Sequence, residues 1–289
     1  MATIIFGLLP CLLLAVSLVG CSAVRIGYQN APNLLYWWID SYVDFDDTQS
    51  IQARDALASL HAWHARQELP AYIGLLRNLQ AMAIADLTPQ QVCAPMQAIR
   101  DHLHTLLTQA EPGIAALLPS VKPTQIDHLS RQFDKRNQKW RAQWLEGTPP
   151  ERRERRLKQA VERYESFYGS LEEAQLAVLR ANIERSRFDP NLRYQETLQR
   201  QREALQALRQ LLASNKAEAG ASSAVHSVVE HLFSSPDPAL RARFEADFQD
   251  SCRAMAELHN STTPAQRRKA IATLKNYEDD LRAVLPVGR

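Results

Sequence analysis

The sequence is short of glycine, which accounts for only 9 of its 289 residues, or about 3% where roughly 7% is usual. Sandwiches, barrels and glycine-rich phosphate-binding folds need more glycine, because their turns use backbone angles that other residues avoid. The chain also lacks an excess of one charge, with 34 basic and 32 acidic side chains and a net charge of +2. This balance argues against a nucleic-acid partner. The composition therefore argues against turn-rich folds and nucleic-acid binding, but it does not indicate an activity.

Only one long apolar run is present, and it lies at the N-terminus. Residues 4–19 read IIFGLLPCLLLAVSLV, and no charged side chain precedes Arg25. The run is too short for a spanning helix and has the length of the apolar core of a secretory signal peptide. An uncleaved N-terminal anchor is the alternative.

The tetrapeptide Leu18-Val19-Gly20-Cys21 follows, and it resembles the bacterial lipobox. The resemblance implies that residues 1–20 are a lipoprotein signal peptide and that Cys21 carries a covalent lipid. Residues 21–31 would then form a lipidated tether, and the membrane would be a partner through this anchor. Under the sorting rule of such lipoproteins, Ser22 implies the outer membrane, with the protein facing the periplasm.

Cysteine is also scarce. Of the four cysteines, Cys11 leaves with the signal peptide and Cys21 carries the lipid. Cys93 and Cys252 then remain in an oxidising compartment, where a disulfide between them is the natural hypothesis. It would close a loop of about 160 residues, worth roughly 4–5 kcal/mol in the chain-entropy description. Two buried free thiols are the alternative.

Motifs with known chemistry are missing. The chain has no Gly-x-Ser-x-Gly elbow, no Ser-x-x-Lys pair and no Walker or Rossmann glycine pattern. His61, His64 and Glu68 lie near one helical face, but no other segment offers matching ligand spacing, and the polar border of an amphipathic helix explains them better. The sequence therefore predicts no catalytic residues, no metal site, no cofactor and no enzyme activity.

Helical periodicity runs from residue 32 onward and predicts an all-α bundle of about ten helices in one large domain, 32–289. Thr-Pro phrases at Thr88, Thr148 and Thr263, each with Gln or Glu three residues after the threonine, predict helix starts. The small and polar residues of 213–224 predict a flexible surface loop. In the helix over 34–42 we expect Leu34, Leu35, Trp38 and Tyr42 to pack into the core and Trp37 to remain for the membrane interface. The alternative is that the aromatic segment 36–38 as a whole lies in that interface.

Charge is unevenly distributed along the chain. Residues 22–86 carry 4 basic and 7 acidic side chains, whereas residues 131–209 carry 18 and 12. The basic excess centres on Arg152, Arg153, Arg155 and Arg156. These four predict a face for anionic lipid headgroups or an acidic envelope protein. A solvated helix supported by pairs such as Glu151 with Arg155 is the alternative.

Two resemblances are carried by longer segments. YQNAP at 28–32, LLYWWIDSYVDFDD, WHARQELPAY, RSRFDP and the region around Cys252 are together similar to the Gram-negative lipoproteins with domain of unknown function 6279. LTPQQ at 87–91 is similar to the LTxxQ motif of the Spy/CpxP periplasmic chaperones, and TTPAQ at 262–266 departs from it at the first residue. The resemblances imply a helical envelope lipoprotein and supply no catalytic residues.

The function predicted from the sequence is therefore a non-catalytic interaction protein anchored at the outer membrane. An envelope scaffold, an assembly factor and a chaperone-like binder all fit this description. An enzyme with an unfamiliar helical active site, acting on an envelope component, is the alternative.

Overall fold

The structure is a computed structural model that describes residues 19–214 and 217–286. Within these residues the chain forms twelve α-helices, one short 3-10 helix and no strand. The all-α prediction is confirmed. The elements are α2 (Val19–Gln29), α3 (Ala31–Val43), α4 (Asp47–Gln67), α5 (Leu69–Met82), α6 (Pro89–Leu117), η1 (Leu118–Ser120), α7 (Pro123–Trp144), α8 (Pro149–Tyr168), α9 (Glu173–Arg185), α10 (Pro190–Ala213), α11 (Ala217–Phe233), α12 (Pro238–Asn260) and α13 (Pro264–Ala283).

Three helices begin at the Thr-Pro phrases. Thr88, Thr148 and Thr263 each accept a hydrogen bond from the backbone N–H three residues later, and the side chain at that position accepts one from the threonine N–H. Proline lies in the first turn of all three helices, where its missing N–H removes no helical hydrogen bond. This exchange satisfies donors that a helix leaves free. These three predicted starts are confirmed.

The expected number of about ten helices was too low. Residues 47–82 form two helices, because α4 ends at Gln67 and Pro70 lies in the first turn of α5. The predicted loop over 213–224 was also wrong, since α11 begins at Ala217. Ala221 and Val225 of α11 are buried against α6 and α10, and this burial outweighs a local composition that resembles a loop.

The segment expected to be a tether, 21–31, lies in α2 and at the first residue of α3. Helix α2 packs against α13, so the two ends of the described chain lie together. The predicted signal peptide, apart from Val19 and Gly20, falls outside the described residues, and so does the side chain of Cys21.

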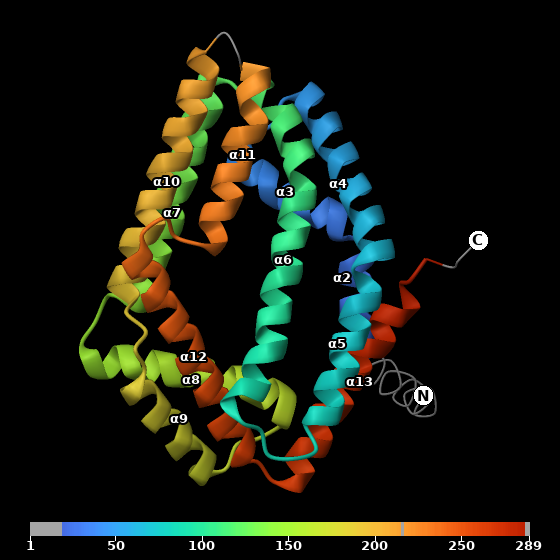
Figure 1. Ribbon diagram of the computed structural model, residues 1–289, viewed down its shortest axis with the longest axis vertical. Coiled ribbons are helices and arrows are strands. Elements are labelled where there is room, and N and C mark those ends of the chain that lie inside the picture. The colour runs from blue at the N-terminus through green and yellow to red at the C-terminus, as the bar shows by residue number, and fades with distance from the viewer. Residues whose placement is uncertain (1–18, 215–216, 287–289) are drawn as a thin grey trace, which may run out of the picture.

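Helix α6 runs along the middle of an elongated molecule (Figure 1). Its 29 residues span about 44 Å, and it contacts α4 and α11 toward one end and α12 toward the other. Helices α7 and α10 pack side by side, while α8, α9, α12 and α13 gather at the lower end of Figure 1. The apolar core is divided into small clusters along this length.

Two pairs of buried glutamines join helix starts that are distant in sequence. Gln49 of α4 pairs with Gln125 of α7, and Gln175 of α9 pairs with Gln266 of α13. Within each pair, each side-chain amide donates to the oxygen of the other, at 2.7 to 3.2 Å. Each glutamine is also the third residue of a capped helix.

Further hydrogen bonds complete both glutamine pairs in the same way. Each amide oxygen accepts from the backbone N–H of the residue that caps its own helix. Each amide nitrogen donates to a backbone carbonyl in the segment before the partner helix, at Ser120, Asp44, Ser261 and Ser170. The same joint therefore fixes two helix pairs at opposite ends of the molecule.

Candidate ligand-binding cavity

An apolar cavity of about 420 Å³ lies between α3, α4, α6, α7 and α10. Three of its lining residues are polar without being ionisable, namely Ser59, Gln109 and Gln125, and no ionisable side chain lines it. The volume falls within the roughly 300–1,000 Å³ range of small-molecule sites, which are mostly apolar with a few polar groups. The cavity can therefore accept an apolar ligand, and its walls contain no group for acid–base chemistry.

Small residues bring two of the cavity walls together. A Cβ atom on Gly113 of α6 would approach the Cβ of Ala56 in α4 to 3.0 Å, so glycine at this position allows the close crossing of the two helices. The preceding Pro112 also lines the cavity and offers no backbone N–H to the helix. These two residues therefore favour a close crossing of α4 and α6 beside the cavity.

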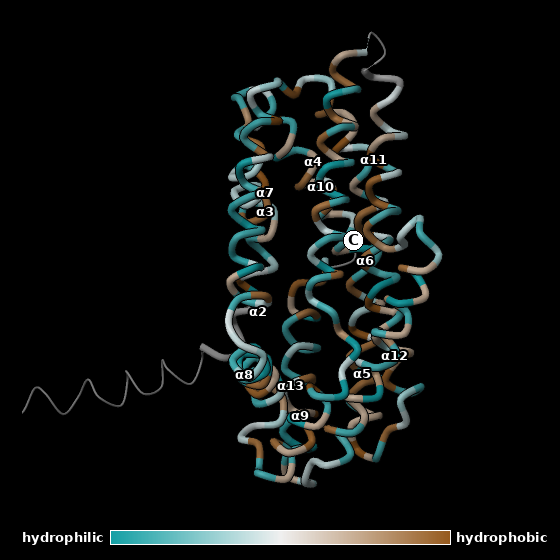
Figure 2. Tube along the Cα trace, turned by 90° about the vertical axis from the view of Figure 1, so that its left-hand side faces the viewer, coloured by the Kyte–Doolittle hydropathy of each residue, from teal (hydrophilic) through white to brown (hydrophobic). Residues whose placement is uncertain are grey.

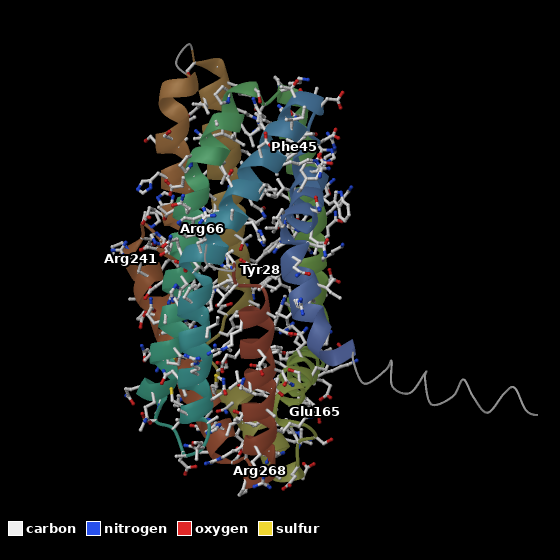
Figure 3. All side chains as sticks on the ribbon, turned by 90° about the vertical axis from the view of Figure 1, so that its right-hand side faces the viewer. Tyr28, Phe45, Arg66, Glu165, Arg241 and Arg268 are labelled. Atoms are coloured by element: carbon white, nitrogen blue, oxygen red, sulfur yellow. A yellow bond between two sulfur atoms is a disulfide. The ribbon has the colours of Figure 1, made fainter. Side chains whose placement is uncertain are left out.

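The turn between α3 and α4 lies at the same end of the molecule. Asp44 takes a left-handed backbone conformation with φ of 59°, and Phe45, which lines the cavity, follows it. Figure 3 shows Phe45 at the upper end of the molecule. Gln125 lines the cavity as well, so one of the two glutamine pairs forms part of its wall.

A second apolar groove, of about 290 Å³, adjoins the cavity. Trp38, Tyr42 and Phe133 line it, and it shares Ile39 and Leu129 with the cavity. The shared residues belong to α3 and α7. The groove therefore lies next to the cavity on the outer side of α3, and Arg136 and Gln201 complete its lining.

A charged cavity of about 420 Å³ lies elsewhere, between α6, α10, α11 and α12. Its lining includes Arg100, Arg193 and Arg200 as well as the buried carboxylates of Glu196 and Asp247. Burial is the main cause that lowers the pKa of Arg193, whose guanidinium lies 3.7 Å from the ring centre of Phe244. One carboxylate oxygen each of Glu196 and Asp247 is buried without a hydrogen-bond partner, although both acids lie within ion-pair distance of arginines.

A cluster of tyrosine and histidine side chains joins α2 to α4. The hydroxyl of Tyr28 lies 3.0 Å from Nδ1 of His64, and His61 Nε2 donates to the Tyr28 carbonyl at 3.0 Å. Figure 3 shows Tyr28 between these helices. Burial raises the pKa of Tyr28 to about 12 and lowers the pKa of His64. The pair is therefore neutral near pH 7 and serves as a packing contact.

Glu68, the third member of the candidate metal pattern, lies in a different contact. Its carboxylate accepts a hydrogen bond from His102 Nδ1 of α6 at 2.7 Å. Across the described part of the chain, no group of three or more His, Cys, Asp or Glu side chains is arranged to hold a metal ion.

Cys93 and Cys252 come together although 159 positions separate them in sequence. Their sulfur atoms lie 2.07 Å apart, a disulfide distance, and their Cα atoms lie 5.3 Å apart. Cys252 is fully buried beside Val92 and Ala256. The pair joins the beginning of α6 to the middle of α12 near the lower end of the molecule.

The four arginines of the basic helix α8 do not form one outward face. Arg152 donates to the carbonyls of Leu145 and Gly147 at 3.2 and 2.8 Å. Arg155 donates to the carbonyls of Gln143 and Glu146. These carbonyls lie at and just beyond the end of α7, where a helix lacks internal donors.

The other two arginines differ in exposure. Arg156 is half-buried with its guanidinium 5.4 Å from the ring centre of Phe188, and burial lowers its pKa. Arg153 is the only exposed member of the four. Much of the positive charge predicted for an external partner thus makes contacts inside the fold.

Sequence reasoning missed the apolar cavity and the glutamine pairs. The capping pattern marked Gln266 but gave no sign of a partner 91 positions away. No sequence motif marks the cavity, because its walls come from five helices and consist mostly of ordinary aliphatic residues.

A comparison with known protein families finds one match. A sequence model described as a family of unknown function, DUF6279, matches residues 41–218, which are 178 of the 289 residues. The match is shorter than the similarity expected from the sequence, which included residues 28–32 and the region of Cys252. No curated protein and no solved structure matches the chain. Among the described helices, none has both the length and the apolar character to cross a bilayer.

Proposed function

The chain belongs to DUF6279, a family of unknown function, and we propose that this member is a non-catalytic binding protein of the bacterial cell envelope. It is anchored to the outer membrane by a lipid on Cys21 and faces the periplasm. Its ligand is an acyl chain, presented by an envelope lipid or by another lipoprotein. The observation that carries this proposal is the apolar cavity of about 420 Å³ without an ionisable residue in its lining.

The shape and chemistry of the cavity favour an acyl chain over a polar metabolite. A polar or charged ligand loses its hydration on entry and needs buried partners in return, and this lining offers three uncharged polar residues. The amide of Gln125 is already engaged with Asp44 and Gln49. An apolar chain needs no such partners, because its burial is favourable in itself.

The N-terminal sequence and the cysteine pair support the location. The apolar run over 4–19 and Cys21 fit a lipoprotein signal, and the disulfide distance between Cys93 and Cys252 fits an oxidising compartment. Both observations are independent of the cavity.

A fluorescent fatty acid, cis-parinaric acid, tests the ligand class directly. Titration of the purified chain is expected to give saturable fluorescence. The variant Ala110→Phe, which places a ring in the cavity lining, is expected to weaken binding by about tenfold or more. Ala116→Phe is the matched control, because Ala116 is exposed on the same helix and lies outside the lining. Equal binding by the two variants, or no saturable signal with the natural chain, would contradict the proposal.

The second candidate, an enzyme acting on an envelope component, is favoured by one observation in the charged cavity. Glu196 and Asp247 each have a buried carboxylate oxygen that makes no hydrogen bond and lies 3.5 Å from an arginine nitrogen, and ionisable groups gathered in a cleft are candidates for catalysis. Glu196→Gln with Asp247→Asn tests it in a strain that lacks the natural chain. Loss of envelope integrity with this double variant, and normal integrity with Ala110→Phe, would favour the enzyme.

A further inference from the structure

Helix α3 exposes large apolar side chains, most of which we expected to pack into the core. Trp37 and Trp38 are 61% and 54% exposed, and Leu34 and Leu35 are also exposed. Tyr36, by contrast, is buried, with its hydroxyl donating to Ser50 at 2.9 Å. The expectation that Trp38 packs into the core is therefore wrong, because the helix turns Tyr36 inward instead.

The four exposed residues lie on one face of α3. At 100° per residue, Trp37, Leu34, Trp38 and Leu35 fall within an arc of about 160°. The acidic residue of this helix, Asp40, lies outside the arc and accepts a hydrogen bond from the backbone of Phe45. A face of this kind, with two tryptophans and two leucines and without an acid, has the composition of a segment at a membrane interface.

An arginine borders this face. Arg136 of α7 donates to the hydroxyl of Tyr42 at 3.4 Å, on the same side of α3 as Leu35 and Trp38, whereas Arg54 of α4 lies 3.5 Å from the ring centre of the inward-facing Tyr36. Both arginines are exposed. A cation beside an apolar patch, here Arg136, complements the anionic headgroups of a bilayer.

The chain that precedes α3 indicates what covers the face. Helix α2 begins at Val19, directly after the apolar residues 4–18, and Asn30 alone separates it from α3. Cys21 and Leu34 are 13 positions apart, which is at most about 20 Å of helix. Both interpretations of the N-terminus, a lipidated cysteine or an uncleaved anchor, bring a membrane to this end of α2. Figures 2 and 3 show α2 and α3 along one long side of the molecule.

We infer that the exposed face of α3, formed by Leu34, Leu35, Trp37 and Trp38, lies in the headgroup layer of the membrane that holds the N-terminus. The molecule then rests with its α2–α3 side on the bilayer. The anchor supplies the attachment, and the α3 face fixes the orientation.

This orientation also places the cavity near its ligand, a consequence that rests on the proposed function. Trp38 lines the groove that shares Ile39 and Leu129 with the cavity. An acyl chain that leaves the bilayer at α3 would meet a mostly apolar groove, whose lining also includes Arg136 and Gln201, before it reaches the cavity.

Contact quenching tests the docking. The full-length, lipidated chain is reconstituted into vesicles of phosphatidylethanolamine and phosphatidylglycerol whose acyl chains carry bromine, a quencher of tryptophan fluorescence. The natural chain is expected to be quenched, and the double variant Trp37→Phe with Trp38→Phe is expected to lose this quenching. Trp140→Phe with Trp144→Phe is the matched control, since it removes two tryptophans from α7 and is expected to keep the quenching.

Equal quenching of the natural chain and the Trp37 and Trp38 variant would overturn the inference. So would a second copy covering the face: the detergent-solubilised chain would sediment as a dimer, Leu34→Asp would convert it to a monomer, and brominated lipid would quench neither. The assay uses no fatty-acid ligand. Quenching without binding of cis-parinaric acid would therefore refute the proposed ligand alone, and binding without quenching would refute the docking alone.

Discussion

The glutamine pair between α9 and α13 provides a quantitative test of what holds the fold together. Gln175→Leu keeps a similar side-chain volume and removes four hydrogen bonds. The lost bonds run to the carbonyl of Ser261, to both amide atoms of Gln266 and from the backbone N–H of Glu172, at 2.7 to 3.1 Å. The side chain is 1% exposed, so water cannot replace these partners.

The expected loss of stability follows from these four bonds. Each contributes about 0.5–1.5 kcal/mol net, and the leucine recovers part of the loss by burying apolar surface. We expect the free energy of unfolding to fall by about 3 kcal/mol. Gln91→Leu is the matched control, because Gln91 has the same place in a capping box but is exposed and accepts one bond from Thr88. Its cost should stay near or below about 1 kcal/mol.

Urea unfolding followed by far-ultraviolet circular dichroism measures both values. In a double-mutant cycle, Gln175→Leu with Gln266→Leu should cost less than the sum of the single variants by about 1–3 kcal/mol. The physical reason is that each single variant orphans its partner, whereas the double variant leaves two apolar groups in contact. If Gln175→Leu costs no more than Gln91→Leu, or if the costs of the two single variants simply add, then the paired glutamines do not stabilise the fold through their mutual hydrogen bonds.

Two further predictions concern the cysteines and the histidines. Cys93→Ala with Cys252→Ala should lower the free energy of unfolding by about 5 kcal/mol and abolish the effect of dithiothreitol on urea unfolding; alkylation of two thiols in the natural chain without reductant would contradict the disulfide. Burial lowers the pKa of His64 and of His259 in the folded chain. As the pH falls, these histidines therefore take up protons in the unfolded chain before they do so in the folded chain, and the stability present above about pH 6.5 is lost. Urea unfolding at about pH 7.5 and about pH 5 should therefore show a smaller drop for His64→Gln than for the natural chain, and an equal drop would refute the assignment.

Helix starts could be predicted because capping is local. Thr88, Thr148 and Thr263 lie within three residues of the groups they bond, so a short window of sequence contains the whole interaction. The all-α class followed from the same signals and from the scarcity of glycine. The family resemblance likewise needed only linear segments.

Contacts made across the fold could not be predicted in this way. Six consecutive apolar residues, 34–39, cover every side of α3, so periodicity does not choose which one faces inward. The hydroxyl of Tyr36 donates a hydrogen bond to Ser50, and its ring stacks with Phe45. These contacts come from the α3–α4 turn and from α4, and they settle the rotation that exposes Trp37 and Trp38.

The basic helix α8 shows that predictions from charge have the same limit. The number of arginines over 152–156 indicates a positive segment, but the groups that each guanidinium contacts depend on where the end of α7 lies. Arg152 and Arg155 bond carbonyls there, which a count of charges does not reveal.

The sequence by itself determined a helical chain, the starts of its capped helices and the N-terminal segment that resembles a lipoprotein signal, because each depends on residues a few positions apart. Only the tertiary structure decided the apolar cavity, the paired glutamines and the exposed face of α3. Their parts lie tens of positions apart, and side chains such as Gln175 and Gln266 acquire a partner only when two helix starts pack together.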